Sequence, residues 1–257
     1  MISIFILSFI QGLAEFLPIS SSFHLIVFRD IFLVGNNIIT SDLELTFDIA
    51  LHMGTLFGVL FYFKKDFVNM FKEKHNILIN LIVATIPAAI VGFLFENFIE
   101  SIVRKSYILL IMIFIIMGFI IYLVDNYSNN KKTINNMSIK DAMFIGISQV
   151  FSLIPGVSRS GMTITASRIL KINREDSTKF SFFLSVPIIL GAVVLQLLKI
   201  DFNAININYF FIGIIISFLT GLLSIKILLK YVKNNNFKVF MIYRIILGLI
   251  VLLHILR

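Results

Sequence analysis

The chain has 257 residues, of which 58% are apolar and 14% are charged, with a formal net charge of +8 and no cysteine. Soluble domains carry about 25% charged residues, so this composition excludes a globular protein that covers one core with polar surface. The lack of cysteine excludes disulfides, and the positive charge fits basic loops beside a membrane better than nucleic-acid binding, because no polar domain is present.

Six apolar runs have the length of a membrane-spanning helix. They cover residues 46–63, 77–95, 107–124, 180–198, 207–225 and 239–256. About 20 apolar residues cross a bilayer as a helix. The N-terminal apolar run has no basic region before it and no small-residue cleavage site after it, so we expect it not to be a removable signal peptide. The predicted fold class is an all-α integral membrane protein, with one membrane domain over residues 1–257.

Two further regions are apolar stretches that a polar turn interrupts. Residues 1–17 and 23–34 flank a turn at 18–22, and residues 142–154 and 160–170 flank a turn at 155–161. Each piece is too short or too polar at its ends for a full span. Paired short helices indicate re-entrant helix-turn-helix hairpins, whose turns are tolerated at membrane depth only within protein or a water-filled cavity.

The two halves of the chain resemble each other. Gln11 lies nine residues before Ser20, and Gln149 lies nine residues before Ser158. Three spans follow each turn. We therefore predict internal repeats of about 1–125 and 138–257, which insert in opposite orientations because each has an odd number of spans.

The distribution of basic residues predicts the orientation. If the N-terminus and the first hairpin lie on the outside, fifteen Lys and Arg residues fall on the inside and five on the outside, as the positive-inside rule requires. The inside set is Lys64, Lys65, Lys72, Lys74, Lys131, Lys132, Lys140, Arg168, Lys171, Arg174, Lys179, Lys226, Lys230, Lys233 and Lys238. Arg159 and Arg244 lie within membrane segments. We expect Arg244 to neutralise a dipole or an acid, or to snorkel, and Asp48 to cap its span.

Polar and ionisable side chains gather at the two turns. Burying a charge in a bilayer costs about 2.5–3.5 kcal/mol on insertion scales, so each such group needs a reason. If the turns meet, one pocket holds Gln11, Glu15, Ser20, Ser21, Ser22, His24, Ser158, Arg159, Ser160 and Thr163. This set suits a phosphate, because an arginine donates two parallel hydrogen bonds and serine hydroxyls and N–H groups at helix starts add further donors.

The residue types suggest roles and leave simpler readings open. Glu15 would repel a phosphate, so we expect it to hold a divalent cation, which prefers oxygen ligands. His24 could act as a general acid or base, and a serine could attack phosphorus if a base takes its proton. Alternatively, the serines bond only to backbone, Glu15 is only a structural partner of Arg159, and His24 is a structural histidine.

Two stretches resemble the signatures of a known family. Residues 11–25 read QGLAEFLPISSSFHL, and residues 155–163 read PGVSRSGMT. They resemble the two signatures of the undecaprenyl pyrophosphate phosphatase family, the bacitracin-resistance type. The length, the hydrophobic profile and residues 47–51, FDIAL, also fit, so the resemblance covers essentially the whole chain.

The resemblance implies an enzyme of the bacterial plasma membrane with its active site toward the outer face. Such an enzyme removes the terminal phosphate of undecaprenyl pyrophosphate and thereby recycles the lipid carrier for wall polymers. It needs Mg²⁺ or Ca²⁺. The sequence leaves open whether the protein forms a homodimer. The implied metal ligands are Glu15 and Gln11, the nucleophile is Ser21, the acid or base is His24, and the phosphate binders are Arg159, Ser158, Ser160, Thr163, Ser20 and Ser22.

Two positions depart from the family pattern. Gln11 stands where many members have Glu, which removes a negative charge from a metal site, and Phe23 stands where Gly is usual. The alternative function is a transporter or flippase of a phosphorylated polyprenyl lipid, because inverted repeats with broken helices are typical of transporters.

Overall fold

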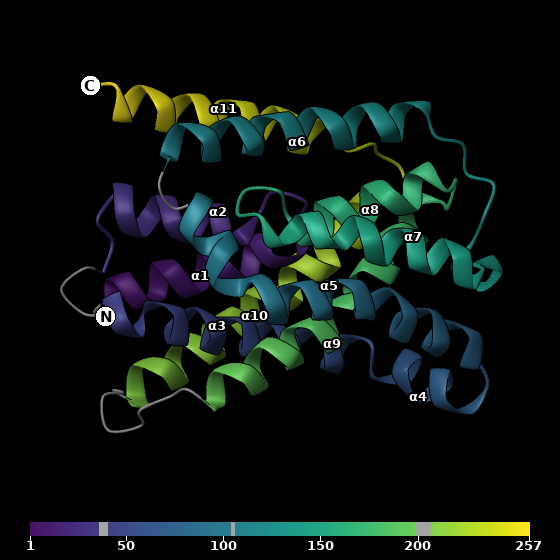
Figure 1. Ribbon diagram of the computed structural model, residues 1–257. Helices are drawn as coiled ribbons and strands as arrows, with labels where there is room; N and C mark the ends of the chain where they lie inside the picture. The colour runs from purple at the N-terminus through teal and green to yellow at the C-terminus, as the bar shows by residue number, and fades with distance from the viewer. Residues whose placement is uncertain (36–40, 104–105, 199–206) are drawn as a thin grey trace.

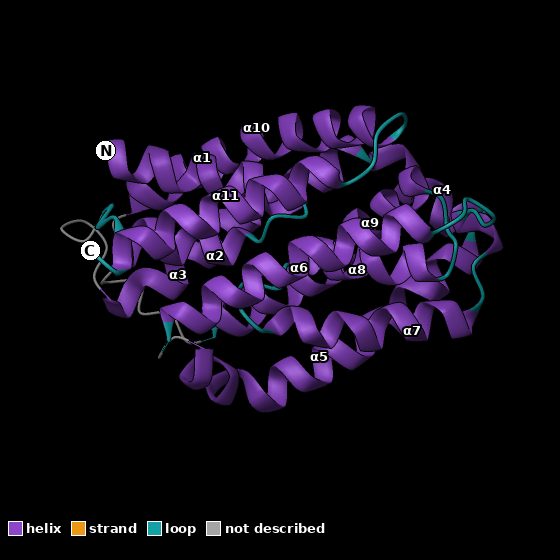
Figure 2. Cartoon of the chain, turned by 90° about the horizontal axis from the view of Figure 1, so that it is seen from above, coloured by secondary structure: helices purple, strands orange, loops and turns teal. Residues whose placement is uncertain are grey.

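The computed structural model describes residues 1–35, 41–103, 106–198 and 207–257. Within these ranges the chain forms eleven α-helices, joined by turns and short 3₁₀ and π segments (Figure 2). The long helices lie side by side in an elongated bundle, and both termini lie at the left end of Figure 1. The prediction of an all-α fold is confirmed.

Six helices are long and apolar enough to cross a membrane, as the sequence predicts. They are α3 (Ser41–Tyr62), α5 (His75–Val103), α6 (Tyr107–Tyr127), α9 (Arg174–Leu197), α10 (Ile207–Val232) and α11 (Lys238–Ile255). α9 begins six residues before the predicted span. The cause is Asn173, whose side-chain oxygen accepts a hydrogen bond from the Asp176 N–H at 2.8 Å and so caps a polar first turn.

Five shorter helices complete the described chain. They are α1 (Ile2–Phe16), α2 (Ser21–Ile26), α4 (Lys64–Lys72), α7 (Ile139–Val150) and α8 (Arg159–Ile169). A π-helix, Val27–Ile31, continues α2, and a 3₁₀ turn, Phe151–Leu153, follows α7. The breaks between α1 and α2 and between α7 and α8 therefore lie where the sequence predicts interrupted segments. α4 is new, because the sequence analysis treats its lysines as loop residues.

The two halves of the chain exchange packing partners. α1 packs on α10, and α7 packs on α5. In the same way α3 packs on α10, α9 packs on α5, and the last spans α6 and α11 pack on each other. Each half thus supports the interrupted segment of the other half, and this brings the two serine turns into the middle of the bundle.

A tight helix crossing lies where α3 meets α10. A Cβ atom on Gly54 would overlap the backbone oxygen of Ile214 and the hydroxyl of Ser217. We expect Gly54→Ala to destabilise the protein by about 2 kcal/mol, because the backbone oxygen cannot rotate away. Thermal unfolding in detergent checks this. Gly191→Ala is the matched control, since a Cβ there meets nothing within 4 Å. Equal melting temperatures for both variants would contradict this packing.

α4 and the connection between α6 and α7, which carry several of the predicted inside lysines, lie at the right end of Figure 1. Ion pairs join Lys179 to Asp66 at 2.6 Å and Lys132 to Asp141 at 3.1 Å. Arg168 differs from the prediction that made it a loop residue. It lies buried in α8, where its Nε donates to Asp125 at 2.8 Å. A guanidinium at that depth needs a carboxylate to offset its lost hydration.

The prediction that Asp48 caps its span is wrong. α3 begins at Ser41, so Asp48 lies two turns inside the helix. Its carboxylate accepts two hydrogen bonds from the buried Arg29, at 3.0 and 2.5 Å. The partner of Asp48 is therefore a side chain of the π-helix that continues α2, in the second piece of the first interrupted region.

Candidate functional site

The two serine turns have the same local geometry. Ser20 and Ser158 both have left-handed backbone angles, with φ of 66° and 80°. The Ser20 hydroxyl accepts a hydrogen bond from the Phe23 N–H, and the Ser158 hydroxyl accepts one from the Gly161 N–H at 3.1 Å. Each serine thus caps the helix after its turn. Non-glycine residues at positive φ cost about 1–3 kcal/mol, and such strain is common at functional sites.

The turns meet in space although about 140 residues separate them. The Ser160 hydroxyl donates to the backbone oxygen of Leu17 at 2.9 Å. Arg159, at the start of α8, donates through one Nη to Glu15 Oε1 at 2.8 Å. The contact between Glu15 and Arg159, which the sequence analysis gave as an alternative, is therefore present, and the two turns touch through Ser160 and Leu17.

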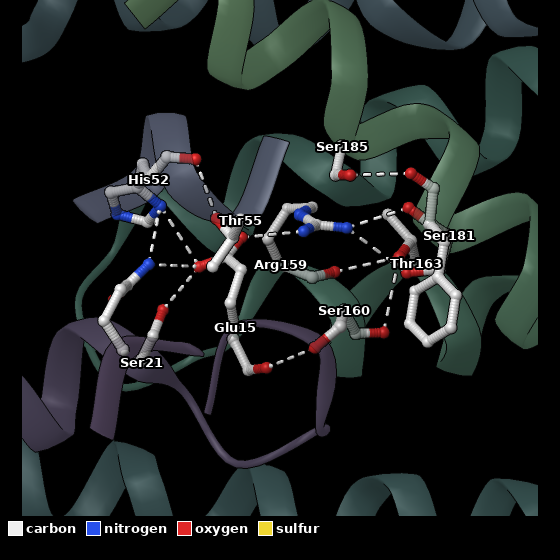
Figure 3. A network of polar contacts seen from close by, with 12 residues as sticks. Glu15, Ser21, His52, Thr55, Arg159, Ser160, Thr163, Ser181 and Ser185 are labelled. Carbon is white, nitrogen blue, oxygen red and sulfur yellow. Dashed lines mark hydrogen bonds and ion pairs between the residues drawn. The ribbon is translucent and has the colours of Figure 1, made fainter. Parts of the chain in front are cut away.

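Glu15 is the centre of this cluster (Figure 3). Its Oε1 accepts from Arg159, and its Oε2 accepts from the Ser21 hydroxyl at 2.9 Å and from Gln11 Nε2 at 3.0 Å. The carboxylate is nearly inaccessible, with 5% of the side chain exposed. One buried carboxylate therefore holds an arginine on one oxygen and a serine hydroxyl on the other. This arrangement can both hold an anion and activate an alcohol.

The second turn is anchored to α9. Arg159 donates to the backbone oxygen of Ser181 at 2.8 Å, and the Thr163 hydroxyl donates to the Ser181 hydroxyl at 2.8 Å. The sequence analysis missed Ser181. Its signal is that Ser177, Ser181 and Ser185 repeat every four residues, which places buried hydroxyls on one face of the helix.

His52 of α3 also lies in the cluster. Its Nδ1 is 2.9 Å from Gln11 Nε2 and 3.2 Å from Glu15 Oε2 (Figure 3). The sequence analysis did not name His52 as a site residue. Its position inside a membrane span could have identified it as a candidate, because ionisable residues in spans are costly and commonly functional.

His24 lies beside the cluster and faces elsewhere. Its Nδ1 is 2.7 Å from the backbone oxygen of Ser20, and its Nε2 is 2.7 Å from the Tyr243 hydroxyl of α11. Within the described ranges neither ring nitrogen hydrogen bonds to Ser21 or Glu15. The structure therefore places the predicted acid or base next to the first turn, with its ring toward α11.

Phe23, the departure from the family pattern, fills the core behind the first turn. Its ring stacks on Phe114 with centroids 3.7 Å apart and an interplanar angle of 6°. The Arg244 guanidinium lies 5.0 Å from the Phe114 centroid. The ring at position 23 thus packs away from Glu15 and joins α2 to α6.

Arg244 holds the two turns together; of its predicted roles, pairing with an acid and snorkelling are wrong. It is fully buried and, in the described part of the chain, contacts no carboxylate. Its donors reach backbone oxygens on both turns and on α6, namely those of Pro18 at 2.9 Å, Phe114 at 3.0 Å, Val157 at 3.3 Å and Gly156 at 3.4 Å. Turn carbonyls that no helix satisfies need these donors, since water is excluded.

We expect Arg244→Ala to destabilise the fold by about 3 kcal/mol, because it leaves several buried carbonyls without donors. Detergent melting curves measure the effect, and Arg257→Ala at the exposed C-terminus is the control. Arg244→Lys, with fewer donors, should fall between the two. A melting temperature unchanged in Arg244→Ala would show that the turns do not depend on this side chain.

The oxygen atoms near Glu15 fit a divalent cation in part. Gln11 Oε1 is buried and has no hydrogen-bond partner. The Gln11 amide also donates a hydrogen bond to Glu15, so one amide oxygen and one carboxylate lie close together as possible cation ligands. Within the described ranges no group of three or more His, Asp or Glu side chains could hold a metal ion. Mg²⁺ is commonly held by one or two carboxylates plus substrate phosphates, and this donor set fits that mode.

An apolar groove lies between α3, α5 and α9. Its volume is about 270 Å³, and its lining includes Ile49, Gly92, Leu153, Pro187 and Gly191. Ile49 lies three residues before His52 on α3, and Leu153 lies two residues before the second turn. The groove therefore reaches structural elements of both halves of the site.

The whole chain is similar to known bacterial proteins. Residues 4–250 match the family described as "Bacitracin resistance protein BacA". The undecaprenyl-diphosphatase of Caldicellulosiruptor bescii is 44% identical over 255 residues, covering 96% of this chain and 94% of the relative. That of Pelagibacter ubique is 38% identical, covering 97% and 95%. Undecaprenyl-diphosphatase 3 of Bacillus cereus is 37% identical, with the same coverage.

Proposed function

The chain belongs to the bacitracin resistance protein BacA family, and from this membership and the cluster around Glu15 we propose that it is an undecaprenyl-diphosphatase. It hydrolyses undecaprenyl diphosphate to undecaprenyl phosphate and inorganic phosphate in the bacterial membrane. The reaction recycles a lipid carrier for the cell wall and gives resistance to bacitracin. One observation carries the proposal, namely that Ser21 and Arg159 bind opposite oxygens of one buried carboxylate.

In the proposed mechanism Arg159 binds the terminal phosphate and Ser21 attacks it. The Ser21 proton passes to Glu15 Oε2, which already accepts that hydrogen bond at 2.9 Å. The new bond joins Ser21 Oγ to phosphorus, and the bridging P–O bond breaks to release undecaprenyl phosphate. Water then displaces the serine oxygen, which takes its proton back from Glu15, and inorganic phosphate leaves. A carboxylate within hydrogen-bond distance of a hydroxyl is the arrangement that nucleophilic catalysis requires.

Four of the hydroxyls that the sequence analysis expected to bind phosphate are hydrogen-bonded to other groups of the protein. Ser20 and Ser158 cap helices, Ser160 bonds to Leu17, and Thr163 bonds to Ser181. The Gly161 N–H already donates to Ser158, so we assign phosphate binding to the N–H groups of Arg159 and Ser160 at the start of α8. A helix N-terminus favours an anion through these N–H groups and its dipole. Ser22, exposed at the start of α2, stays a proposed phosphate ligand.

A divalent cation, Mg²⁺ or Ca²⁺, completes the proposed site. Glu15 and the unpaired Gln11 Oε1 would hold it together with phosphate oxygens of the substrate. When bound it offsets the negative charge of the diphosphate. Because Gln11 is neutral, the protein supplies little charge of its own, and the cation would enter with the substrate.

We also propose that the two halves are inverted repeats with re-entrant hairpins and that the site faces outward. The matched Ser20 and Ser158 turns and the exchanged packing of α1 on α10 and α7 on α5 support the repeat. The lysine-rich end of the bundle supports an inside location for that end. The isoprenoid chain would lie between apolar helices, in the groove that α3, α5 and α9 line.

The test is phosphate release from undecaprenyl diphosphate by the purified protein in detergent, with Mg²⁺ or Ca²⁺ and then with a chelator. We expect release that the cation supports and the chelator abolishes. Undecaprenyl phosphate serves as the control substrate and should stay intact. No release by a protein with a normal melting transition would refute the phosphatase and favour transport of a phosphorylated lipid, the alternative to which the exchanged packing also points.

A further inference from the structure

Glu15 is held from three sides, and His52 provides the side that lies on another span. Gln11 is one turn away on the same helix, and Arg159 comes from α8. His52 comes from α3, with its Nδ1 3.2 Å from Oε2, the oxygen that accepts the Ser21 hydroxyl. The position of this oxygen therefore depends on a contact between two different helices.

When substrate binds, the partners of Glu15 differ in how firmly they hold its carboxylate in place. In the proposed function Arg159 turns toward phosphate oxygens, which weakens its hold on Oε1. Gln11 moves with Glu15, because both belong to α1. His52 is then the partner that ties the carboxylate to an independent part of the bundle. Side chains that orient a reacting group are effective when packing restrains their own conformation, and α3 is packed tightly against α10 at the neighbouring Gly54.

We infer that His52 is a positioning residue, whose Nδ1 keeps Glu15 Oε2 directed at Ser21. This role rests on the proposed function, because it concerns the same reacting serine. His52 acts through the base Glu15, and we assign it no contact with Ser21 Oγ or with the phosphate. Its side chain is 28% exposed while that of Glu15 is 5% exposed, so it forms the outer edge of the cluster. A histidine that merely fills space on α3 would sit equally well without its Nδ1 contact, and this difference can be measured.

The geometry of the contact dictates the variants. In His52→Asn the amide group occupies the place of Nδ1, one bond beyond Cγ. In His52→Gln the amide lies farther from the backbone, near the place of Nε2. His52→Leu keeps a similar volume and removes the polar atoms. His254→Leu is the matched control, since His254 lies near the end of α11 and contacts Phe32.

Phosphate release is measured for each full-length variant under the same conditions. We expect His52→Leu to lower kcat by about 10–100-fold, the usual effect of losing a group that orients a reacting residue, with little change in KM. His52→Asn should recover most of the lost rate, and His52→Gln should resemble His52→Leu. His254→Leu should match wild type. A normal kcat in His52→Leu, or equal losses in the Asn and Gln variants, would overturn the inference.

A second measurement is independent of turnover. The chain has four histidines, so ¹⁵N-histidine labelling gives few ring signals, and the His52 variants assign the His52 pair. We expect Glu15→Gln to shift the His52 Nδ1 signal and to leave the His254 signals in place. An unmoved His52 signal would overturn the contact even if the wild-type protein were inactive. An inactive wild type with a shifted signal would reject the phosphatase while keeping the Glu15–His52 contact.

Discussion

Arg159→Ala is expected to lower kcat/KM for phosphate release by about 10²–10³-fold. Removal of one preorganised donor from a developing anion commonly has an effect of this size. Arg159 is the one guanidinium in the described part of the chain that reaches the Glu15–Ser21 cluster, and it is held there by Ser181. Its loss therefore removes the main positive charge that faces the terminal phosphate.

The variant Arg159→Lys separates charge from geometry. Lysine keeps the positive charge and lacks the planar fork that binds two phosphate oxygens at once, so its activity should fall between wild type and Arg159→Ala. Arg257→Ala is the control for a lost arginine outside the site. Melting curves must accompany these assays, because Glu15 without Arg159 is a buried charge that has lost its ion pair. Full activity in folded Arg159→Ala would remove Arg159 from the mechanism.

Ser21→Ala should abolish measurable phosphate release, a loss of at least about 10³-fold, because a nucleophile acts as a unit with its base. The hydroxyl of Ser21 is the one that donates to Glu15 at 2.9 Å. The neighbouring Ser20 has a different task, since its hydroxyl caps α2. The structure thus distinguishes two adjacent serines that have the same residue type and nearly the same position in the chain.

The matched control is Ser8→Ala, also on a buried serine of the first interrupted segment. The Ser8 hydroxyl donates only to the backbone oxygen of Ile4 in its own helix, at 2.6 Å, so we expect near-normal turnover. A transporter needs Arg159 for binding and has no need of a nucleophile at position 21. Normal phosphate release in Ser21→Ala would assign the attack to water, while lipid movement without phosphate release in wild type would support the transporter.

The sequence by itself determines the membrane-spanning segments and the two breaks. The bilayer imposes this, because a span needs about 20 apolar residues and a polar turn at depth needs protein around it. α1, α7 and α8 accordingly begin and end close to the predicted pieces, whereas α2 ends at Ile26 and a π-helix to Ile31 continues it. The candidate residues Glu15, Ser21 and Arg159 could also be named from the sequence, because charged and hydroxyl groups are costly in a membrane and lie next to the breaks.

Only the tertiary structure decides which histidine touches Glu15. His24 is three residues from Ser21 in the chain, yet α2 directs its ring to Tyr243, whereas His52 reaches Glu15 from a different helix. The four carbonyl contacts of Arg244 and the anchoring of Arg159 by Ser181 are likewise contacts between helices. Local chemistry sets where helices start and stop, but the direction of a side chain follows from the helix that carries it and from its packing partners.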